Sequence, residues 1–287
     1  MDIQKTKTEL TEIFNKAIFA IHDDGWNRHP LRVVQAVKSL IGINISSPNT
    51  KLLTWVKEYS STLKVRPKSE LMFKFGELEE TITIHSLEMA IKGGDQKVAF
   101  SHLEQLSRVS DGRPILEFLL ELSAQQSGIS FLFALTALRS NLFLANKKIT
   151  ALLMLCTQSI LDDSFKEWGL NPNSLDFKST FELNCQVLQC HHEDLVRLIK
   201  IKPWLPRISE IINNSDDIKN IEDPLNILSI GRQGILDCID KVESNLITPK
   251  IILTLDAYRS ALKVAPQYAE KIISASPKHL LNLFNVK

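Results

Sequence analysis

The chain has 287 residues, with 34 Lys and Arg side chains against 33 Asp and Glu side chains, so its formal net charge is +1. A hydrophobic fraction of 44% with 23% charged residues is typical of a globular protein with a sizeable core and excludes a disordered chain. Because the charges nearly cancel, no long-range field of one sign is available, and nucleic acid is not indicated as a partner.

The cysteines and the start of the chain bear on where the protein works. The four thiols lie within apolar patterns and form no CxxC pair, which predicts reduced core cysteines in a cytoplasmic protein. The first residues lack the basic start and apolar core of a secretory signal. The most apolar stretch, Ile129 to Leu138, is well short of the roughly twenty residues that a membrane span needs. We therefore expect no membrane anchor.

Helical periodicity dominates the first part of the chain. Apolar residues at i, i+3 and i+4 spacing predict a first helix, which Asp23-Asp24-Gly25 ends. Two more helices follow, the later one after an N-cap at 46–48. Pro67 is expected to open a further helix, and the longest uninterrupted helical pattern comes next. The predicted ranges are Thr6–His22, Pro30–Gly42, Leu52–Leu63 and Leu71–Ile91.

Turn residues then divide the chain at intervals of about one helix. The glycine pair at 93–94 separates the long pattern from a helix that Asp95 caps, and residues 110–114 mark the next break. The segments 129–145 and 148–162 are the most apolar, so we expect them at the centre of the core. This spacing predicts antiparallel helical hairpins.

The predicted fold class is therefore all-α: an irregular stack of antiparallel helical hairpins, as a multi-helical bundle or a short solenoid, without a sheet. The strand-like alternation from Thr81 to Ile84 lies in a helical context, which we expect to override it. A predicted loop at 164–177 separates an N-terminal lobe, 1–163, from a C-terminal lobe, 164–287, unless the two form one continuous domain. Predicted helices of the second lobe are 175–190, 224–230, 234–246, 249–264, 266–275 and 277–284.

Three residues around the glycine pair form a candidate metal site. His85 and Glu88 share a helix face, and His102 lies as far beyond the turn as His85 lies before it. In a tight hairpin these side chains would meet at similar heights and would hold iron or zinc. The simpler interpretation is of surface histidines bound to carboxylates or water, with no cofactor. The Glu-x-x-His pairs of a ferritin-like bundle and the His-Glu-x-x-His motif of a zincin are both missing.

A second group of metal-ligand residue types is a weaker candidate. Cys185, Cys190, His191 and His192 lie close in sequence, but Cys190 points to a different face of a helix than Cys185 and His192. Structural zinc sites usually have two close-set ligand pairs, each on a turn. We do not assign a metal to this group.

Two other places carry candidate ligand-binding residues. The loop after the first helix contains Trp26 and His29, and loops on rigid scaffolds often carry function. Arg139 and Asn141 interrupt the most apolar helix, where an unpaired guanidinium is costly. Arg139 is expected to reach a carboxylate, a helix C-terminus, solvent or a ligand anion. The alternatives are a capped connection with Trp26 folded onto the core, and a structural ion pair at Arg139.

These observations leave two hypotheses of function. The first is an interaction or scaffold protein that binds a peptide or protein partner in a groove between helices. The second is a helical enzyme or ligand-binding protein with a pocket between helices, metal-dependent through His85, Glu88 and His102. No phosphate loop or nucleophile elbow occurs, so the sequence carries no recognisable catalytic signature. If the protein is an enzyme, the leading hypothesis is a metal-dependent oxidoreductase of the helical-bundle type. We prefer the first hypothesis, because it requires fewer specific roles of individual residues.

Overall fold

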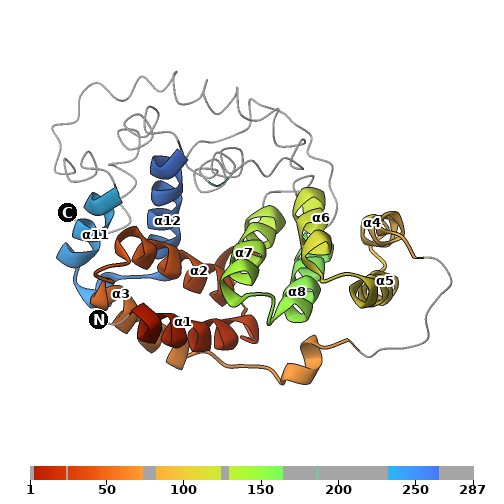
Figure 1. Ribbon diagram of the computed structural model, residues 1–287, viewed down its shortest axis with the longest axis horizontal. Coiled ribbons are helices and arrows are strands. Elements are labelled where there is room, and N and C mark those ends of the chain that lie inside the picture. The colour runs from red at the N-terminus through yellow and green to blue at the C-terminus, as the bar shows by residue number, and fades with distance from the viewer. Residues whose placement is uncertain are drawn as a thin grey trace, which may run out of the picture. The chain divides into compact units, whose positions relative to one another are not determined.

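The computed structural model confirms the predicted all-α class (Figure 1). It describes residues 3–23, 25–73, 82–123, 129–163, 186 and 232–264. These residues form ten α-helices and several short 3-10 helices, with no β-sheet among them. Extended pairing in this part of the chain is limited to one isolated antiparallel bridge between Ala20 and Val65.

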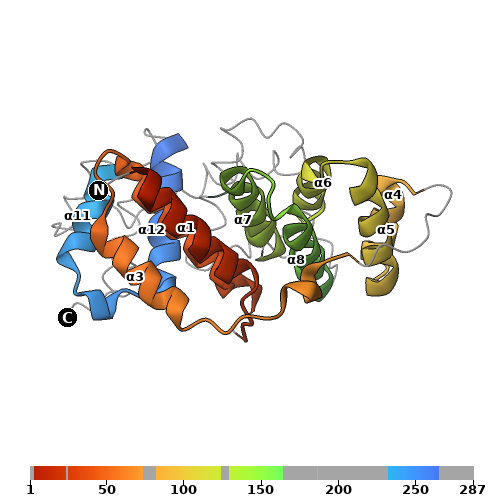
Figure 2. The same cartoon turned by 60° about the horizontal axis from the view of Figure 1, so that its bottom comes forward.

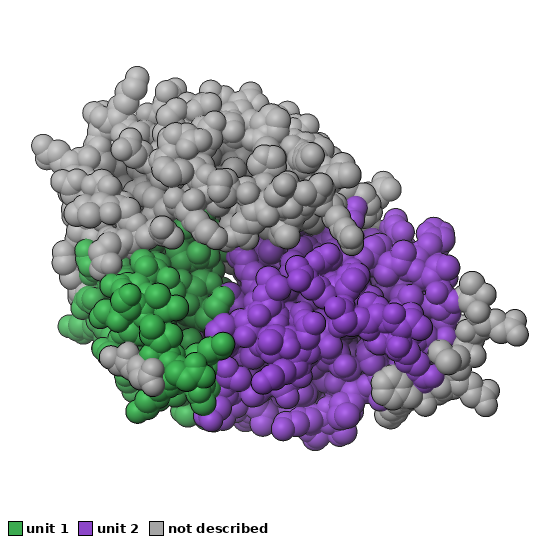
Figure 3. Space-filling view, viewed as in Figure 1, with its two compact units in different colours: residues 1–10, 36–61, 171–287 green, residues 11–35, 62–170 purple. Residues whose placement is uncertain are grey.

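The chain divides into two compact units, which Figure 3 shows in different colours. Unit 1 comprises residues 1–10, 36–61 and 171–287, and unit 2 comprises residues 11–35 and 62–170. The helices α1 (Ile3–Ile18) and α2 (Pro30–Ile41) each contribute residues to both units.

In unit 2, a capped hairpin is formed by α4 (Ile84–Lys92) and α5 (Gln96–Val109). The predicted glycine turn at 93–94 joins them, and the Asp95 carboxylate accepts a hydrogen bond from the Val98 amide, as an N-cap should. The two helices lie side by side in both ribbon views (Figures 1 and 2). This part of the hairpin prediction is confirmed.

The core of unit 2 is built by α6 (Arg113–Ser123), α7 (Ile129–Leu144) and α8 (Ile149–Asp162), which pack against one another. Side chains all around α7 are buried, and those of Phe131 and Phe133 are almost completely inaccessible. A helix that is apolar on every side has to be surrounded by other elements. The predicted central position of these two apolar helices is confirmed.

Two predicted helices end or begin elsewhere than expected. The first helix stops at Ile18 rather than His22, because the Ile21 amide donates to the Lys64 carbonyl at 2.8 Å and the Arg66 amide donates to the Phe19 carbonyl at 2.7 Å. These bonds take the place of the last helical turn. The local pattern could not reveal them, because their partners lie more than forty positions away.

The predicted helix Leu71–Ile91 is also wrong. Leu71 ends a short 3-10 helix, η3 (Lys68–Leu71), and Met72 is extended. The α-helix begins only at Ile84, since the extended residue Thr83 caps it through its hydroxyl, which accepts from the Ser86 amide at 3.1 Å. Residues 74–81 lie outside the described part of the chain.

Unit 1 contains η2 (Gly42–Asn44), α3 (Thr50–Ser61), α11 (Arg232–Lys241), η8 (Ser244–Leu246) and α12 (Pro249–Val264). The cap of α3 is Asn49, whose side chain accepts from the Leu52 amide at 2.9 Å, and not the predicted segment 46–48. Helix α11 contacts η2, α3 and α12. The indole of Trp55 donates to the Ile247 carbonyl at 2.9 Å, which ties α3 to the segment before α12.

Several predictions fall outside the described residues. They are the loop at 164–177, the helices 224–230, 266–275 and 277–284, almost all of 175–190, and the cluster of Cys185, Cys190, His191 and His192. The predicted division into lobes at residue 164 therefore stays a prediction. Among the helices that the structure does describe, none has the length and apolar character needed to cross a membrane.

Candidate functional site

The loop after α1 presents Trp26 at the surface of unit 2. Residues Trp26–Arg28 form a 3-10 turn, η1, which packs against α7. The Ala20–Val65 bridge anchors the start of this loop, and α2 begins directly after it at Pro30. The loop is thus held at both ends.

The indole ring of Trp26 is fixed by four neighbours. It stacks on His29 with ring centroids 5.5 Å apart and planes 3° apart, and it meets Phe133 edge-on at 4.7 Å. His22 adds another edge-on contact at 5.4 Å. The Nε1–H donates to Oδ2 of Asp162 at 2.9 Å, at the end of α8. Packing and a charge-assisted hydrogen bond together hold the indole ring in one orientation.

His29 is the buried support of this loop. Its Nδ1 accepts a hydrogen bond from the Leu31 amide at 3.1 Å, so a neutral ring carries its proton on Nε2. Burial lowers the pKa of His29 well below its usual value, and electrostatic interactions with His22, Arg66 and Arg32 lower it further. The imidazole is therefore neutral near pH 7 and serves as a packing surface for Trp26.

A half-open cleft of about 490 Å³ lies beside Trp26, between η1, η3, α5 and α8. Its walls combine apolar, amide and charged side chains. The lining residues are His22, Asp23, Gly25, Trp26, Arg66, Glu70, Leu71, Gln96, Phe100, Met154, Leu155, Gln158 and Asp162. A volume of this size is within the usual range for ligand sites, and the mixture of walls suits recognition of an amphipathic group.

A chain of hydrogen bonds runs across the cleft. The amide of Gln96 on α5 donates to Gln158 on α8 at 2.9 Å, and Gln158 donates in turn to Oδ1 of Asp162 at 2.6 Å. The other oxygen of Asp162 accepts from Trp26. Each carboxylate oxygen thus has one neutral donor, which orients the group and leaves lone pairs for further donors.

The cleft is negatively charged. Three carboxylates line it, those of Asp23, Glu70 and Asp162, against one guanidinium, that of Arg66. Arg66 donates from Nη2 to the Ala20 carbonyl at 3.3 Å, and no ion pair joins it to these carboxylates within the described chain. Asp162 also ends α8, where the helix dipole adds negative potential. The net formal charge of the walls is −2 with His22 neutral.

Arg139 and Asn141 lie on α7, outside the cleft walls. Arg139 is half-buried, and Asn141 is fully buried. The Asn141 amide donates to the side-chain oxygen of Asn146 at 2.6 Å. Asn146 lies in the tight turn before α8, at a positive φ of 62°, so this bond stabilises the α7–α8 connection. Of the predicted ligand-binding residues, only Trp26 lines the cleft, and His29 supports it from beneath.

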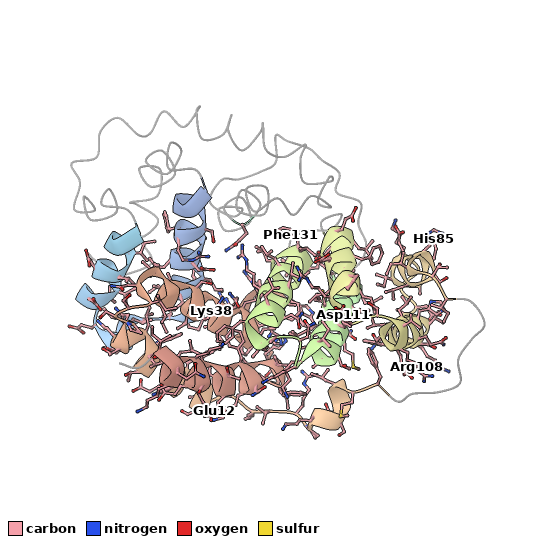
Figure 4. The ribbon with its side chains drawn as sticks, viewed as in Figure 1. Glu12, Lys38, His85, Arg108, Asp111 and Phe131 are labelled. Atoms are coloured by element: carbon pink, nitrogen blue, oxygen red, sulfur yellow. The ribbon has the colours of Figure 1, made fainter. Side chains whose placement is uncertain are left out.

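The predicted metal ligands are not gathered into one site. His85 Nδ1 lies 3.6 Å from the Glu88 carboxylate, which also binds Lys92 at 2.5 Å. The His85 side chain is 74% exposed, and in Figure 4 it projects from the edge of α4 away from α5, the helix that carries His102. Among the described residues, no three His, Cys, Asp or Glu side chains lie close enough together to hold a metal ion. An iron or zinc site stays a prediction.

A smaller hollow of about 250 Å³ lies in unit 1 beside Trp55. Two of its polar side chains already have internal partners: Lys51 donates to the Asp240 carbonyl at 3.1 Å and to the Val242 carbonyl, and Trp55 donates to the Ile247 carbonyl. Lys51 thereby satisfies carbonyls at the end of α11. The residues of this hollow connect α3 to α11 and to the segment before α12, so the Trp26 cleft is the stronger candidate for a binding site.

No family model, curated protein or solved structure matches this chain at a significant level. Sequence reasoning singled out Trp26 but missed Asp162, Gln158, Arg66 and Phe100. The only local signal was the Asp162-Asp163 pair at the end of an otherwise apolar helix, an unfavourable place for two carboxylates.

Proposed function

We propose that this protein is an interaction protein that binds an exposed peptide segment of a partner protein in the Trp26 cleft. The observation that carries the proposal is the pre-oriented carboxylate of Asp162 within a half-open cleft that also has aromatic and aliphatic walls. A peptide side chain offers an apolar stem and a polar head together, which matches such a lining.

The energetic basis is pre-organisation. The side chains of Trp26, Gln158 and Asp162 are already held by packing and hydrogen bonds, so little further side-chain entropy is lost when a ligand binds. Trp26 and Phe100 supply the rigid aromatic surface that interface hot spots commonly use. We place this activity in the reducing cytoplasm, because the Cys156 thiol is unpaired and buried in α8.

The proposal is tested by selecting binders from a random dodecapeptide display library on the purified full-length protein. We expect enriched peptides whose binding is lost in Phe100→Ala. The matched control is Tyr59→Ala, which removes another half-buried aromatic ring outside the cleft, in unit 1. Circular dichroism checks that both variants keep their helix content.

Two results would overturn the proposal. One is a selection that enriches no peptide. The other is a set of enriched peptides that bind Phe100→Ala as tightly as the wild type and that lose affinity in Tyr59→Ala.

A further inference from the structure

The charge of the cleft and the partners of its carboxylates identify the chemistry of the occupant. We infer that the cleft receives a lysine or arginine side chain, whose cationic head binds Asp162 while its aliphatic stem lies along the apolar wall. This inference rests on the proposed function and adds the class of peptide to it.

The first observation is that the carboxylates of the cleft have no ion-pair partner in the described part of the chain. Asp23, Glu70 and Asp162 form no ion pair with a Lys, Arg or His side chain in the described part of the chain, although all three line one cleft. Carboxylates placed together repel one another. A cationic group that entered the cleft would relieve this repulsion and form charge-assisted hydrogen bonds.

The geometry of Asp162 is the second observation. Its two oxygens each accept one hydrogen bond from a neutral donor, from Trp26 at 2.9 Å and from Gln158 at 2.6 Å. The carboxylate is exposed and keeps free lone pairs. Since the negative end of the α8 dipole lies at the same place, the position favours a cation and disfavours an anion.

The remaining walls fit the rest of a basic side chain. Leu155 is buried and Met154 and Phe100 are half-buried, so apolar surface lies beside the carboxylates. The stems of Lys and Arg pack well on such surface while their heads reach polar partners. The aromatic rings of the wall add the option of a cation–π contact.

The test uses the full-length protein labelled with 5-fluorotryptophan, so that binding in the cleft is read from the fluorine resonance of Trp26. Trp26→Phe assigns that resonance. The probes are three pools of heptapeptides that are randomised except for the central residue, which is Arg or Lys in one pool, Glu in the second and Leu in the third.

We expect the basic pool to shift the Trp26 resonance with the highest affinity. Asp162→Asn should weaken this binding about tenfold, because it removes the charge-assisted contact. Glu70→Gln changes an exposed position in the cleft wall and should weaken this binding by a smaller factor. Raising the salt concentration from 50 to 500 mM shortens the Debye length about threefold, so it should weaken binding to the wild type. The control is Asp95→Asn, which removes a carboxylate outside the cleft and keeps the N-cap of α5.

The outcomes separate the two proposals. If the Leu or Glu pool shifts Trp26 with higher affinity than the basic pool, the cleft binds peptides but the inferred charge class is overturned. If the basic pool binds equally well to the wild type and to both cleft variants, the assignment to these carboxylates is overturned as well. If no pool moves the Trp26 resonance, the proposed function fails together with the inference.

Discussion

Trp26 and Asp162 lie 136 positions apart in the sequence and are joined by a hydrogen bond of 2.9 Å from the indole nitrogen to a carboxylate oxygen. The bond connects the loop after α1 to the end of α8, and both residues line the same cleft. This contact ties the η1 loop to α8 within unit 2 and, together with the bond from Gln158, orients the charged group of the proposed binding site.

The strength of this contact can be isolated by a double-mutant cycle of Trp26→Phe and Asp162→Asn. We expect a coupling free energy of about 1 kcal/mol, because the acceptor is charged but the bond is partly open to water. Urea unfolding of the four proteins measures it. A coupling close to zero would show that the bond does not stabilise the folded chain.

Gly112 and Gly94 provide a matched pair for the turns of unit 2. Both have positive φ angles, 81° and 71°, but a Cβ at Gly112 would lie 2.5 Å from an Ile149 side-chain carbon, whereas one at Gly94 would meet nothing within 4 Å. Replacing either glycine with alanine places a side chain at a positive φ angle, and this backbone strain costs about 1 kcal/mol. Gly112→Ala should cost about 1 kcal/mol more in urea melts, from overpacking. Equal costs would contradict the tight contact of this turn with α8.

Acid should destabilise the protein through His29. Its folded-state pKa lies below the unfolded value of about 6.5, so below that pH the unfolded chain takes up a proton that the folded chain does not. The stability it contributes is complete above pH 6.5 and declines as the pH falls from there towards the folded pKa, by up to about 1.4 kcal/mol per pH unit.

The measurement is urea unfolding between pH 5 and pH 8, compared with His29→Asn. An asparagine oxygen can still accept from the Leu31 amide but carries no titratable proton. The difference in unfolding free energy between the two proteins should therefore depend on pH below 6.5 and not above it. A constant difference across this range would rule out His29 as the buried base.

Cys156 should resist alkylation in the native protein. Its side chain is fully buried in α8, and burial raises the pKa of the thiol, which keeps it protonated and unreactive. Iodoacetamide labelling followed by peptide mass spectrometry should find Cys156 unmodified until the chain is unfolded by urea. Rapid native labelling at this residue would contradict the packing of α8.

The elements that the sequence predicted well depend on local chemistry. The segments 129–145 and 148–162 agree with α7 and α8 to within one residue at each end, because each is predominantly apolar and is bounded by glycine, polar or charged residues. The turn at 93–94 and the cap at Asp95 were likewise local features. The errors at His22 and at 71–91 arose where a distant backbone pairing and a threonine cap interrupted an apolar pattern.

The candidate site was less accessible to sequence reasoning. Trp26 stood out because it lies in a polar loop, but nothing near it in sequence points to Asp162 or Phe100. Arg139 and Asn141 drew attention as polar residues in an apolar helix, and Asn141 proves to bind Asn146 in the next turn. Such a residue is conspicuous in sequence whether it serves a ligand or a turn, because only tertiary structure shows what it contacts.

Photo-crosslinking tests the central claim most directly. A peptide enriched on the wild-type protein is made with benzoylphenylalanine beside its key residue, irradiated in the complex and mapped by mass spectrometry. The account predicts crosslinks to the cleft walls, at residues 22–26, 96–100 and 154–162. Crosslinks confined to other surfaces, such as the hollow beside Trp55, would contradict it.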